Sequence, residues 1–97
     1  MAHRYEFGAA AARDLEALVR HNVPLLLEIV MRHIPNILDD PLAAGERKKG
    51  DLAHVRAYGF TLKRVAYRLV YQVEGDLITF IAVGTHDEAY ARAARRR

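Results

Sequence analysis

The chain of 97 residues contains no cysteine, no tryptophan and no serine. The absence of cysteine excludes disulfides, thiolate metal sites and cysteine nucleophiles, and the absence of serine excludes a serine nucleophile. The longest uninterrupted apolar run, Val23 to Leu27, has five residues, whereas a membrane-spanning helix needs about 20. The N-terminal segment also lacks the apolar core of a secretory signal. We therefore expect a cytoplasmic protein that does not associate with membranes.

Charge and composition are those of a small folded domain with one basic half. Hydrophobic residues make up 52% and charged residues 28% of the chain, and a chain this short has room for one modest core. We expect a single domain over residues 1–97. Residues 1–44 carry four basic and six acidic side chains, whereas residues 45–97 carry eleven basic and six acidic ones. The basic half would attract a polyanion such as nucleic acid, although a solvated surface that binds nothing would look the same.

Helix-forming residues dominate the first half of the chain. A short alternating strand at residues 3–7 ends at Gly8, and an alanine run then starts a helix. Asn22 and Pro24 suit the cap and first turn of a second helix, which Pro35 ends or kinks near Ile34. The two helices predict an antiparallel hairpin. Its apolar side should hold Ala11, Leu15, Leu18, Val19, Leu26, Ile29, Val30 and His33, while Arg13, Asp14, Glu16 and Arg20 face solvent.

Strand-forming residues dominate the second half, after a connector at residues 36–50. Glu74-Gly75-Asp76 is a tight-turn signal, so the strands beside it should pair antiparallel. A last helix from Asp87 to about Ala94 precedes the tail Arg95-Arg96-Arg97. The order predicts an α+β fold: an N-terminal strand, an α-helical hairpin packed on a twisted, mainly antiparallel sheet, and a short C-terminal helix. The three expected strands are Val55 to Leu62, Val65 to Val73 and Leu77 to Val83.

Arg68 stands out because it occupies the middle of the most strand-prone segment, Tyr67 to Val73. A central strand seldom carries a guanidinium unless the charge is paired or the sheet face is open. An ion pair with Asp51, Glu46 or Asp87 would explain it, and so would simple exposure. If the face is open, Arg68 should project near Arg56 of the adjacent strand. Two such arginines would suit bidentate binding of phosphate.

His86 and Tyr90 are four residues apart and therefore share one face if the last helix has begun by His86. Either side chain could exchange a proton near a phosphate. Tyr90 could equally be an aromatic anchor between helix and sheet. Five histidines without cysteine, and without closely spaced histidine pairs, give no reason to expect a metal site or another cofactor.

Several segments together carry a resemblance that covers nearly the whole chain. They are Tyr5-Glu6-Phe7, the helical hairpin, the connector with Asp40-Pro41 and Gly45, the run Tyr67-Arg68-Leu69-Val70-Tyr71-Gln72-Val73, and Val83-Gly84-Thr85-His86-Asp87-Glu88-Ala89-Tyr90. With these segments the chain resembles a toxin of the RelE/ParE superfamily of bacterial and archaeal toxin–antitoxin modules. The Tyr67 to Val73 run is the most specific of them.

The resemblance to RelE-like members implies an endoribonuclease that cleaves mRNA in the ribosomal A site without a metal. The 2′-hydroxyl attacks the adjacent phosphate, so the site must move protons and stabilise a more negative phosphorane. The family's phosphate-contacting strand arginine matches Arg68, and its C-terminal tyrosine matches Tyr90. A second arginine usual before that tyrosine is missing, and His86 in its place is the candidate acid or base. Of the basic residues, Arg56 is the remaining catalytic candidate, and Lys48, Lys49, Lys63 and Arg64 are the candidates for RNA binding.

Two alternatives share this fold. ParE-like members lack the nuclease residues and poison DNA gyrase by protein contact, which would suit the missing arginine. A decayed toxin would only bind its antitoxin. All three alternatives imply a cognate antitoxin, an acidic or amphipathic segment laid across the hairpin and sheet in a toxin–antitoxin hetero-oligomer.

Overall fold

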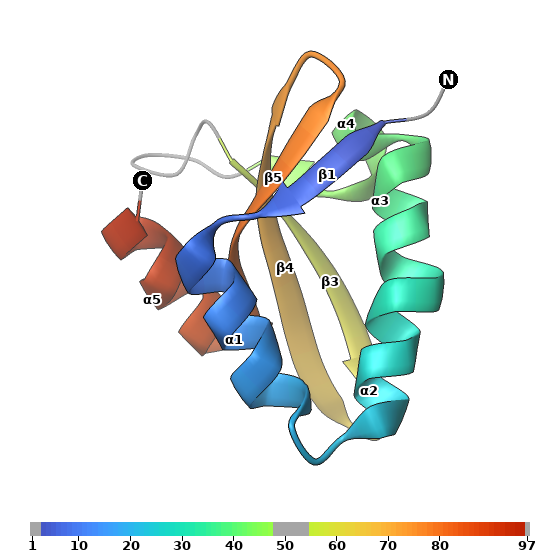
Figure 1. Ribbon diagram of the computed structural model, residues 1–97, viewed down its shortest axis with the longest axis vertical. Helices are drawn as coiled ribbons and strands as arrows, with labels where there is room; N and C mark the ends of the chain where they lie inside the picture. Colours follow the sequence, from blue (N-terminus) through green and yellow to red (C-terminus); the bar gives the residue numbers. More distant parts are fainter. Residues whose placement is uncertain (1–2, 48–54, 97) are drawn as a thin grey trace.

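Five strands form one sheet in the order β1-β5-β4-β3-β2 in the computed structural model, which describes residues 3–47 and 55–96 (Figure 1). The strand β1 pairs parallel with β5, and every other neighbouring pair in the sheet is antiparallel. The predicted α+β architecture with a mainly antiparallel sheet is confirmed. The strands are β1 (Arg4–Phe7), β2 (Glu46–Arg47), β3 (Arg56–Leu62), β4 (Val65–Glu74) and β5 (Leu77–Thr85).

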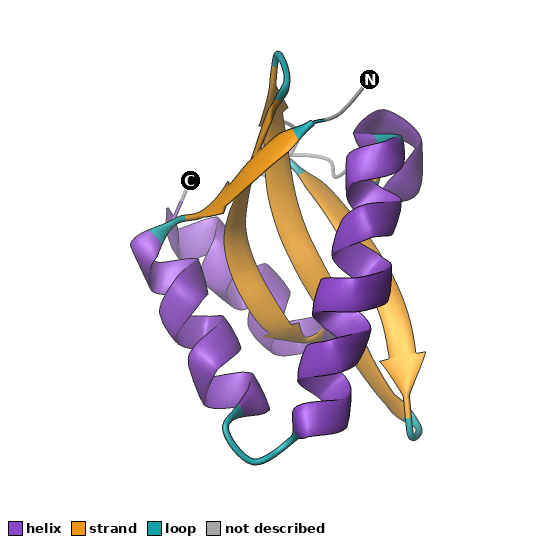
Figure 2. Cartoon of the chain, turned by 45° about the vertical axis from the view of Figure 1, so that its right-hand side comes forward, coloured by secondary structure: helices purple, strands orange, loops and turns teal. Residues whose placement is uncertain are grey.

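Helices cover both faces of the sheet (Figure 2). The N-terminal hairpin packs on one face and the C-terminal helix on the other. No helix within residues 3–47 and 55–96 is long and apolar enough to cross a membrane. The helical elements are α1 (Ala9–Val19), α2 (Val23–Glu28), the π-helical turn η1 (Ile29–His33), α3 (Ile34–Asp39), α4 (Pro41–Ala44) and α5 (His86–Arg96).

The second arm of the hairpin is a helical run from α2 through η1 to α3. It begins as predicted, because Asn22 Oδ1 accepts a hydrogen bond of 3.2 Å from the Leu25 amide and Pro24 lies in the first turn. The prediction that Pro35 ends or kinks this helix near Ile34 is wrong about the end, since α3 continues to Asp39. The wider turn η1 ends at His33, two residues before Pro35. Pro35 therefore lies in the first turn of α3, where its missing N–H costs little.

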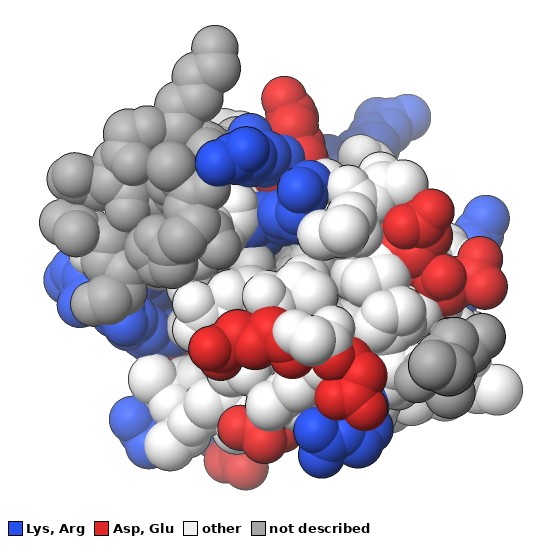
Figure 3. All heavy atoms as spheres, turned by 90° about the horizontal axis from the view of Figure 1, so that it is seen from above, with Lys and Arg blue, Asp and Glu red and all other residues white. Residues whose placement is uncertain are grey.

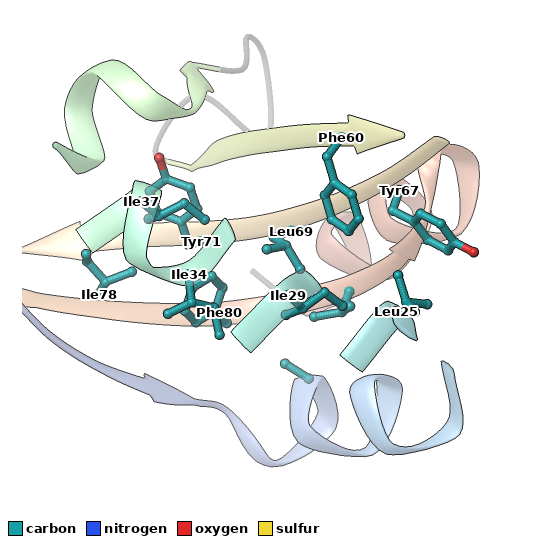
Figure 4. Close-up of a cluster of buried hydrophobic side chains, with 12 residues drawn as sticks. Leu25, Ile29, Ile34, Ile37, Phe60, Tyr67, Leu69, Tyr71, Ile78 and Phe80 are labelled. Atoms are coloured by element: carbon teal, nitrogen blue, oxygen red, sulfur yellow. The ribbon is translucent and has the colours of Figure 1, made fainter. Parts of the chain in front are cut away.

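The side chains of β4 alternate between two separate cores. Tyr67, Leu69 and Tyr71 face the hairpin and are buried, as their alternation predicted. Val70 points to the opposite face and is buried under α5. The hairpin core is the larger of the two, and each large side chain buried there contributes about 1.5–3 kcal/mol. Figure 4 shows this core, which includes Leu25, Ile29, Ile34, Ile37, Phe60, Tyr67, Leu69, Tyr71, Ile78 and Phe80.

Two tight turns connect the antiparallel strands. Gly75 adopts a φ of 61° between β4 and β5, which is the conformation that its turn signal predicted. Lys63 and Arg64 join β3 to β4 with φ of 50° and 71°. Two consecutive residues with positive φ match the twist of the flanking strands in a two-residue hairpin loop.

Four local predictions need correction. Asp14 is buried rather than exposed, because it forms an ion pair with Arg96. Arg96 accordingly belongs to α5 and not to a solvated tail. Val30 is 44% exposed, because Leu25 and Ile29, rather than Leu26 and Val30, face the core. The connector at residues 36–50 contains the end of α3, all of α4 and the short strand β2.

His33 is buried between the hairpin and the sheet. Its ring stacks on Phe60 with centroids 3.9 Å apart, and Nδ1 lies 2.8 Å from the Tyr58 hydroxyl. Nε2 lies 3.3 Å from Glu28 Oε1 without the alignment of a hydrogen bond. Burial lowers the pKa of His33 below its ordinary value of 6.5, and the nearby Glu28 only partly opposes this effect, while Arg32 adds to it. The folded protein therefore holds His33 in its neutral form.

A lowered pKa makes His33 a source of acid sensitivity. Because the unfolded chain binds a proton on this residue more readily than the folded one, the free energy of unfolding should fall as the pH drops below about 6.5. Denaturant unfolding between pH 7.5 and 5.5 should show this slope in the wild type and a smaller slope in His33→Gln. His21→Gln, on the exposed loop between α1 and α2, is the control. Equal slopes in all three proteins would contradict the prediction.

Candidate functional site

Arg68 lies in the middle of β4 with its side chain on the α5 side of the sheet. It pairs with Gly59 on β3 and with Gly84 on β5. The guanidinium extends over Gly59, where an added Cβ would come within 2.7 Å of Arg68 Cζ. Arg68 Nη1 donates a hydrogen bond of 2.9 Å to the Tyr67 carbonyl. The neighbouring glycine on β3 therefore leaves the room that a half-buried guanidinium needs.

A pocket of about 350 Å³ opens beside Arg68. Three of the residues that line it carry chemically functional side chains and come from distant parts of the chain: Arg68, Glu46 and Tyr90. Among the described residues, no carboxylate lies within ion-pair distance of Arg68. The pocket thus combines a positive charge with groups that can accept and donate a proton. Its walls are formed by Ala44, Glu46, Ala57, Gly59, Phe60, Thr61, Arg68 and Tyr90.

Tyr90 reaches the pocket from α5. It is half-buried and packs against the small apolar cluster beneath that helix, so it is an anchor as well as a pocket residue. The ring of His86 meets the Tyr90 ring edge-on, with centroids 4.7 Å apart. His86 Nδ1 lies 2.9 Å from Asp87 Oδ1. The predicted pairing of His86 with Tyr90 on one helical face is confirmed, although His86 is exposed and is not part of the pocket wall.

Arg56 does not project near Arg68, and that expectation is wrong. The register pairs Arg56 with Tyr71, whose side chain faces the hairpin, whereas Arg68 faces α5. Arg56 Nη1 donates to the Leu42 carbonyl at 2.9 Å and to the Gly45 carbonyl at 3.3 Å. Alternation along β3 explains the difference, because the two arginines fall at positions of opposite parity in the β3–β4 pair. Arg56 instead holds the segment that leads into β2.

The remaining basic candidates lie away from the pocket or outside the description. Lys63 and Arg64 are exposed in the turn between β3 and β4, and neither forms a pocket wall. Lys48 and Lys49 lie outside the described residues. Basic and acidic side chains are interspersed on the end of the molecule seen in Figure 3.

Glu46 is the pocket residue that sequence reasoning missed as a chemical group. Within a polar connector, its sequence position suggests only an ion-pair partner for Arg68. In the fold, Glu46 pairs with Ala57 in β2 and so lies on the same sheet face as Gly59 and Arg68. A strand of two residues has no sequence periodicity that could reveal it. The burial of Gly45 directly before Glu46 fixes where this short strand begins.

Comparison with known proteins agrees with this architecture. The model of the family of ParE-like toxins of type II bacterial toxin–antitoxin systems matches residues 10–93. The chain therefore belongs to this family, and the expected RelE/ParE superfamily is confirmed. A search of curated proteins finds no match.

Solved structures share the fold over most of the chain. The RelBE2 toxin–antitoxin complex from Mycobacterium tuberculosis is similar with a TM-score of 0.69 and 19% identity, over 89% of this chain and 100% of that one. A mutant of the Escherichia coli toxin RelE with two arginine-to-alanine substitutions, solved in the free state, is similar with a TM-score of 0.67 and 26% identity. The match covers 99% of this chain and 98% of that one. A conserved hypothetical protein from Helicobacter pylori is similar with a TM-score of 0.63 and 20% identity, over 89% of this chain and 97% of that one.

The contact between Gly59 and Arg68 can be tested directly. Gly59→Ala should displace the guanidinium, because the new Cβ would lie within 2.7 Å of Arg68 Cζ. The fold should persist, since Gly59 has no positive φ and the displaced atoms end a flexible side chain. NMR of the arginine Nε–Hε groups should show a shifted Arg68 signal, with a thermal midpoint changed by less than about 5 °C. An unchanged Arg68 signal would show that the guanidinium lies elsewhere in solution.

Proposed function

We propose that residues 1–97 form one toxin domain that cleaves mRNA on the ribosome and thereby inhibits translation. The observation that carries this proposal is the pocket in which Arg68, Glu46 and Tyr90 meet. RNA cleavage by the 2′-hydroxyl needs a group for each of three tasks: binding the phosphate, accepting a proton and donating one. The pocket offers a group of suitable chemistry for each task, and the reaction needs no metal or cofactor. Such a toxin acts in the cytoplasm.

In the proposed step one phosphorus–oxygen bond forms, another breaks, and two protons are transferred. The 2′-oxygen attacks the adjacent phosphorus, and Glu46 accepts the proton of that hydroxyl. The bond from phosphorus to the 5′-oxygen breaks, and Tyr90 protonates the departing oxygen, with His86 beside it as the alternative donor. Arg68 binds the two non-bridging oxygens, whose negative charge increases in the phosphorane. The products are a 2′,3′-cyclic phosphate and a 5′-hydroxyl.

The ribosome supplies what this shallow pocket lacks. The three groups can act on a phosphate, but among the described residues that line the pocket no pair of aromatic rings is placed to stack on both sides of a base. The RelE-like resemblance implies that the ribosomal A site orients the mRNA. Lys63 and Arg64 would then contact RNA from the β3–β4 turn. Lys48 and Lys49 are proposed as further RNA contacts from their charge alone. Arg56 would support the site indirectly by holding the backbone before Glu46.

An antitoxin is the proposed protein partner. One similar structure is a complex of a toxin with its antitoxin. In the present chain, the outer side of the second hairpin arm carries an exposed apolar stripe. We propose that an amphipathic antitoxin segment covers this stripe. The stripe consists of Val23, Leu27, Val30 and Met31, which are 60%, 51%, 44% and 73% exposed.

Replacement of Arg68 tests the proposed phosphate contact. In a translating extract, the wild type should create new 5′ ends inside the translated codons of a reporter mRNA, and only when ribosomes are present. Arg68→Ala should slow this cleavage by about 100-fold or more, because a preorganised charge at the phosphorane is lost. Arg13→Ala, an exposed arginine on α1, is the matched control and should cleave normally. Equal rates for the wild type and Arg68→Ala would remove Arg68 from the site.

Replacement of Glu46 and Tyr90 separates the proton acceptor from the proton donor. Glu46→Gln keeps the shape of the side chain but removes the base, so cleavage should slow by about 10²-fold or more. Tyr90→Phe keeps the packing against the α5 cluster and removes only the hydroxyl. If Tyr90→Phe cleaves normally while His86→Gln does not, His86 rather than Tyr90 is the donor. Normal cleavage by Glu46→Gln would exclude the carboxylate as the base.

Poisoning of DNA gyrase is the second candidate function. It is favoured by the match to ParE-like toxins and by the absence of the second arginine, whose place His86 and Asp87 take. A DNA supercoiling assay distinguishes the two functions. Inhibition of gyrase without mRNA cleavage would support the ParE-like function, and inactivity in both assays would identify a decayed toxin that only binds its antitoxin.

A further inference from the structure

The edge of β5 changes partners along its length. The first half of the strand pairs with β1, and this pairing ends at Phe7 and Phe80. Beyond that point, side chains from two helices bind the backbone of β5 in place of a strand. Arg96 Nη1 donates to the Ile81 carbonyl at 3.0 Å, and Arg92 Nη1 donates to the Val83 carbonyl at 2.8 Å. The Val83 amide donates to Asp14 Oδ2 at 3.1 Å.

Asp14 joins α1 to α5 at this edge. Its side chain is only 7% exposed, and both of its oxygens accept hydrogen bonds from the Arg96 guanidinium, the one to Oδ1 at 3.0 Å. Arg92 Nε lies 3.8 Å from Oδ1. Burial alone would raise the pKa of Asp14, but hydrogen bonds from Arg96 and Val83 outweigh it and hold the pKa below its usual range. The carboxylate is therefore charged, and both of its oxygens accept hydrogen bonds.

The apolar contact beneath α5 is small. Ala89 and Ala93 are the residues of α5 that are fully buried, with Tyr90 packed partly against them. The sheet residues opposite them are also alanine or valine: Val55, Ala57, Val70 and Ala82. An alanine methyl contributes about 0.8 kcal/mol on burial, much less than the large side chains of the hairpin core. Polar contacts must therefore contribute a larger share of the stability with which α5 packs on the sheet than they contribute to packing of the hairpin.

We infer that Asp14 is a positioning residue for the pocket: through Arg96 and the Val83 amide it fixes α5 against β5, and so places Tyr90 beside Arg68. The ion pair acts near the C-terminal end of α5, whereas Tyr90 and His86 lie nearer its start. Because α5 is a continuous helix, fixing its end and its two buried alanines restricts rotation and tilt of the whole element. The effect on cleavage rests on the proposed function, whereas the effect on α5 does not.

Amide hydrogen exchange of the full chain tests whether the ion pair between Asp14 and Arg96 fixes α5 against β5. Arg96→Gln removes the ion pair, and exchange in residues 86–96 should accelerate by about tenfold, which is what loss of a charge-assisted contact in a local opening equilibrium would cause. Exchange in the central part of β4 should not change. Arg95→Gln, at an exposed neighbouring position, is the matched control. Asp14→Asn should accelerate exchange in the same residues, and the double variant should add little, because both changes break one contact.

Cleavage assays test the consequence for the pocket. Arg96→Gln should lower kcat with little change in KM, and Arg96→Lys should restore part of the rate. Exchange in α5 that is equal in Arg96→Gln and Arg95→Gln would overturn the inference. Accelerated exchange with full cleavage activity would also overturn it, since α5 would then not need to be fixed. If the wild type does not cleave mRNA, the proposed function fails and hydrogen exchange alone decides whether Asp14 holds α5.

Discussion

The pairing of β4 with strands on both sides is the constraint on which the rest of the structure depends. It places a ten-residue strand in the middle of the sheet, and strand geometry then sends alternate side chains to opposite faces. Tyr67, Leu69 and Tyr71 supply the centre of the hairpin core. Arg68 and Val70 supply the other face, where α5 lies. A shift of this strand by one residue would bury the arginine among aromatic rings, so the register is strongly specified.

The two faces differ in the size of their side chains, and this difference shapes the pocket. Aromatic and long aliphatic residues fill the hairpin side, while alanine and valine fill the α5 side. Small residues let α5 approach the sheet closely, and Gly59 leaves space for a guanidinium beside it. The result is a stable core on one side and an open, polar pocket on the other. The candidate site therefore lies on the face that contributes less apolar burial.

The pocket also depends on how the segment before β2 is held. Tyr71 donates a hydrogen bond of 2.6 Å to the Pro41 carbonyl, and burial raises the pKa of this tyrosine to about 12, so its hydroxyl stays protonated. A Cβ on Gly45 would collide with the same hydroxyl. Together with Arg56, these contacts fix the backbone that presents Glu46. A residue of the hairpin core thus positions a residue on the opposite side of the sheet.

The sequence by itself determined most of the elements and the two faces of β4. The alternation from Tyr67 to Val73, the Gly75 turn and the Asn22 cap are local signals, and each depends on residues that are near one another in the chain. Arg68 in its strand and Tyr90 four residues after His86 are likewise visible from local spacing alone. The place of Glu46 in the pocket wall and the ion pair of Asp14 were decided only by the tertiary structure, because a two-residue strand and an ion pair between residues 14 and 96 leave no local pattern. Their position depends on which distant backbone or side chain completes the contact, and only the folded chain brings those partners together.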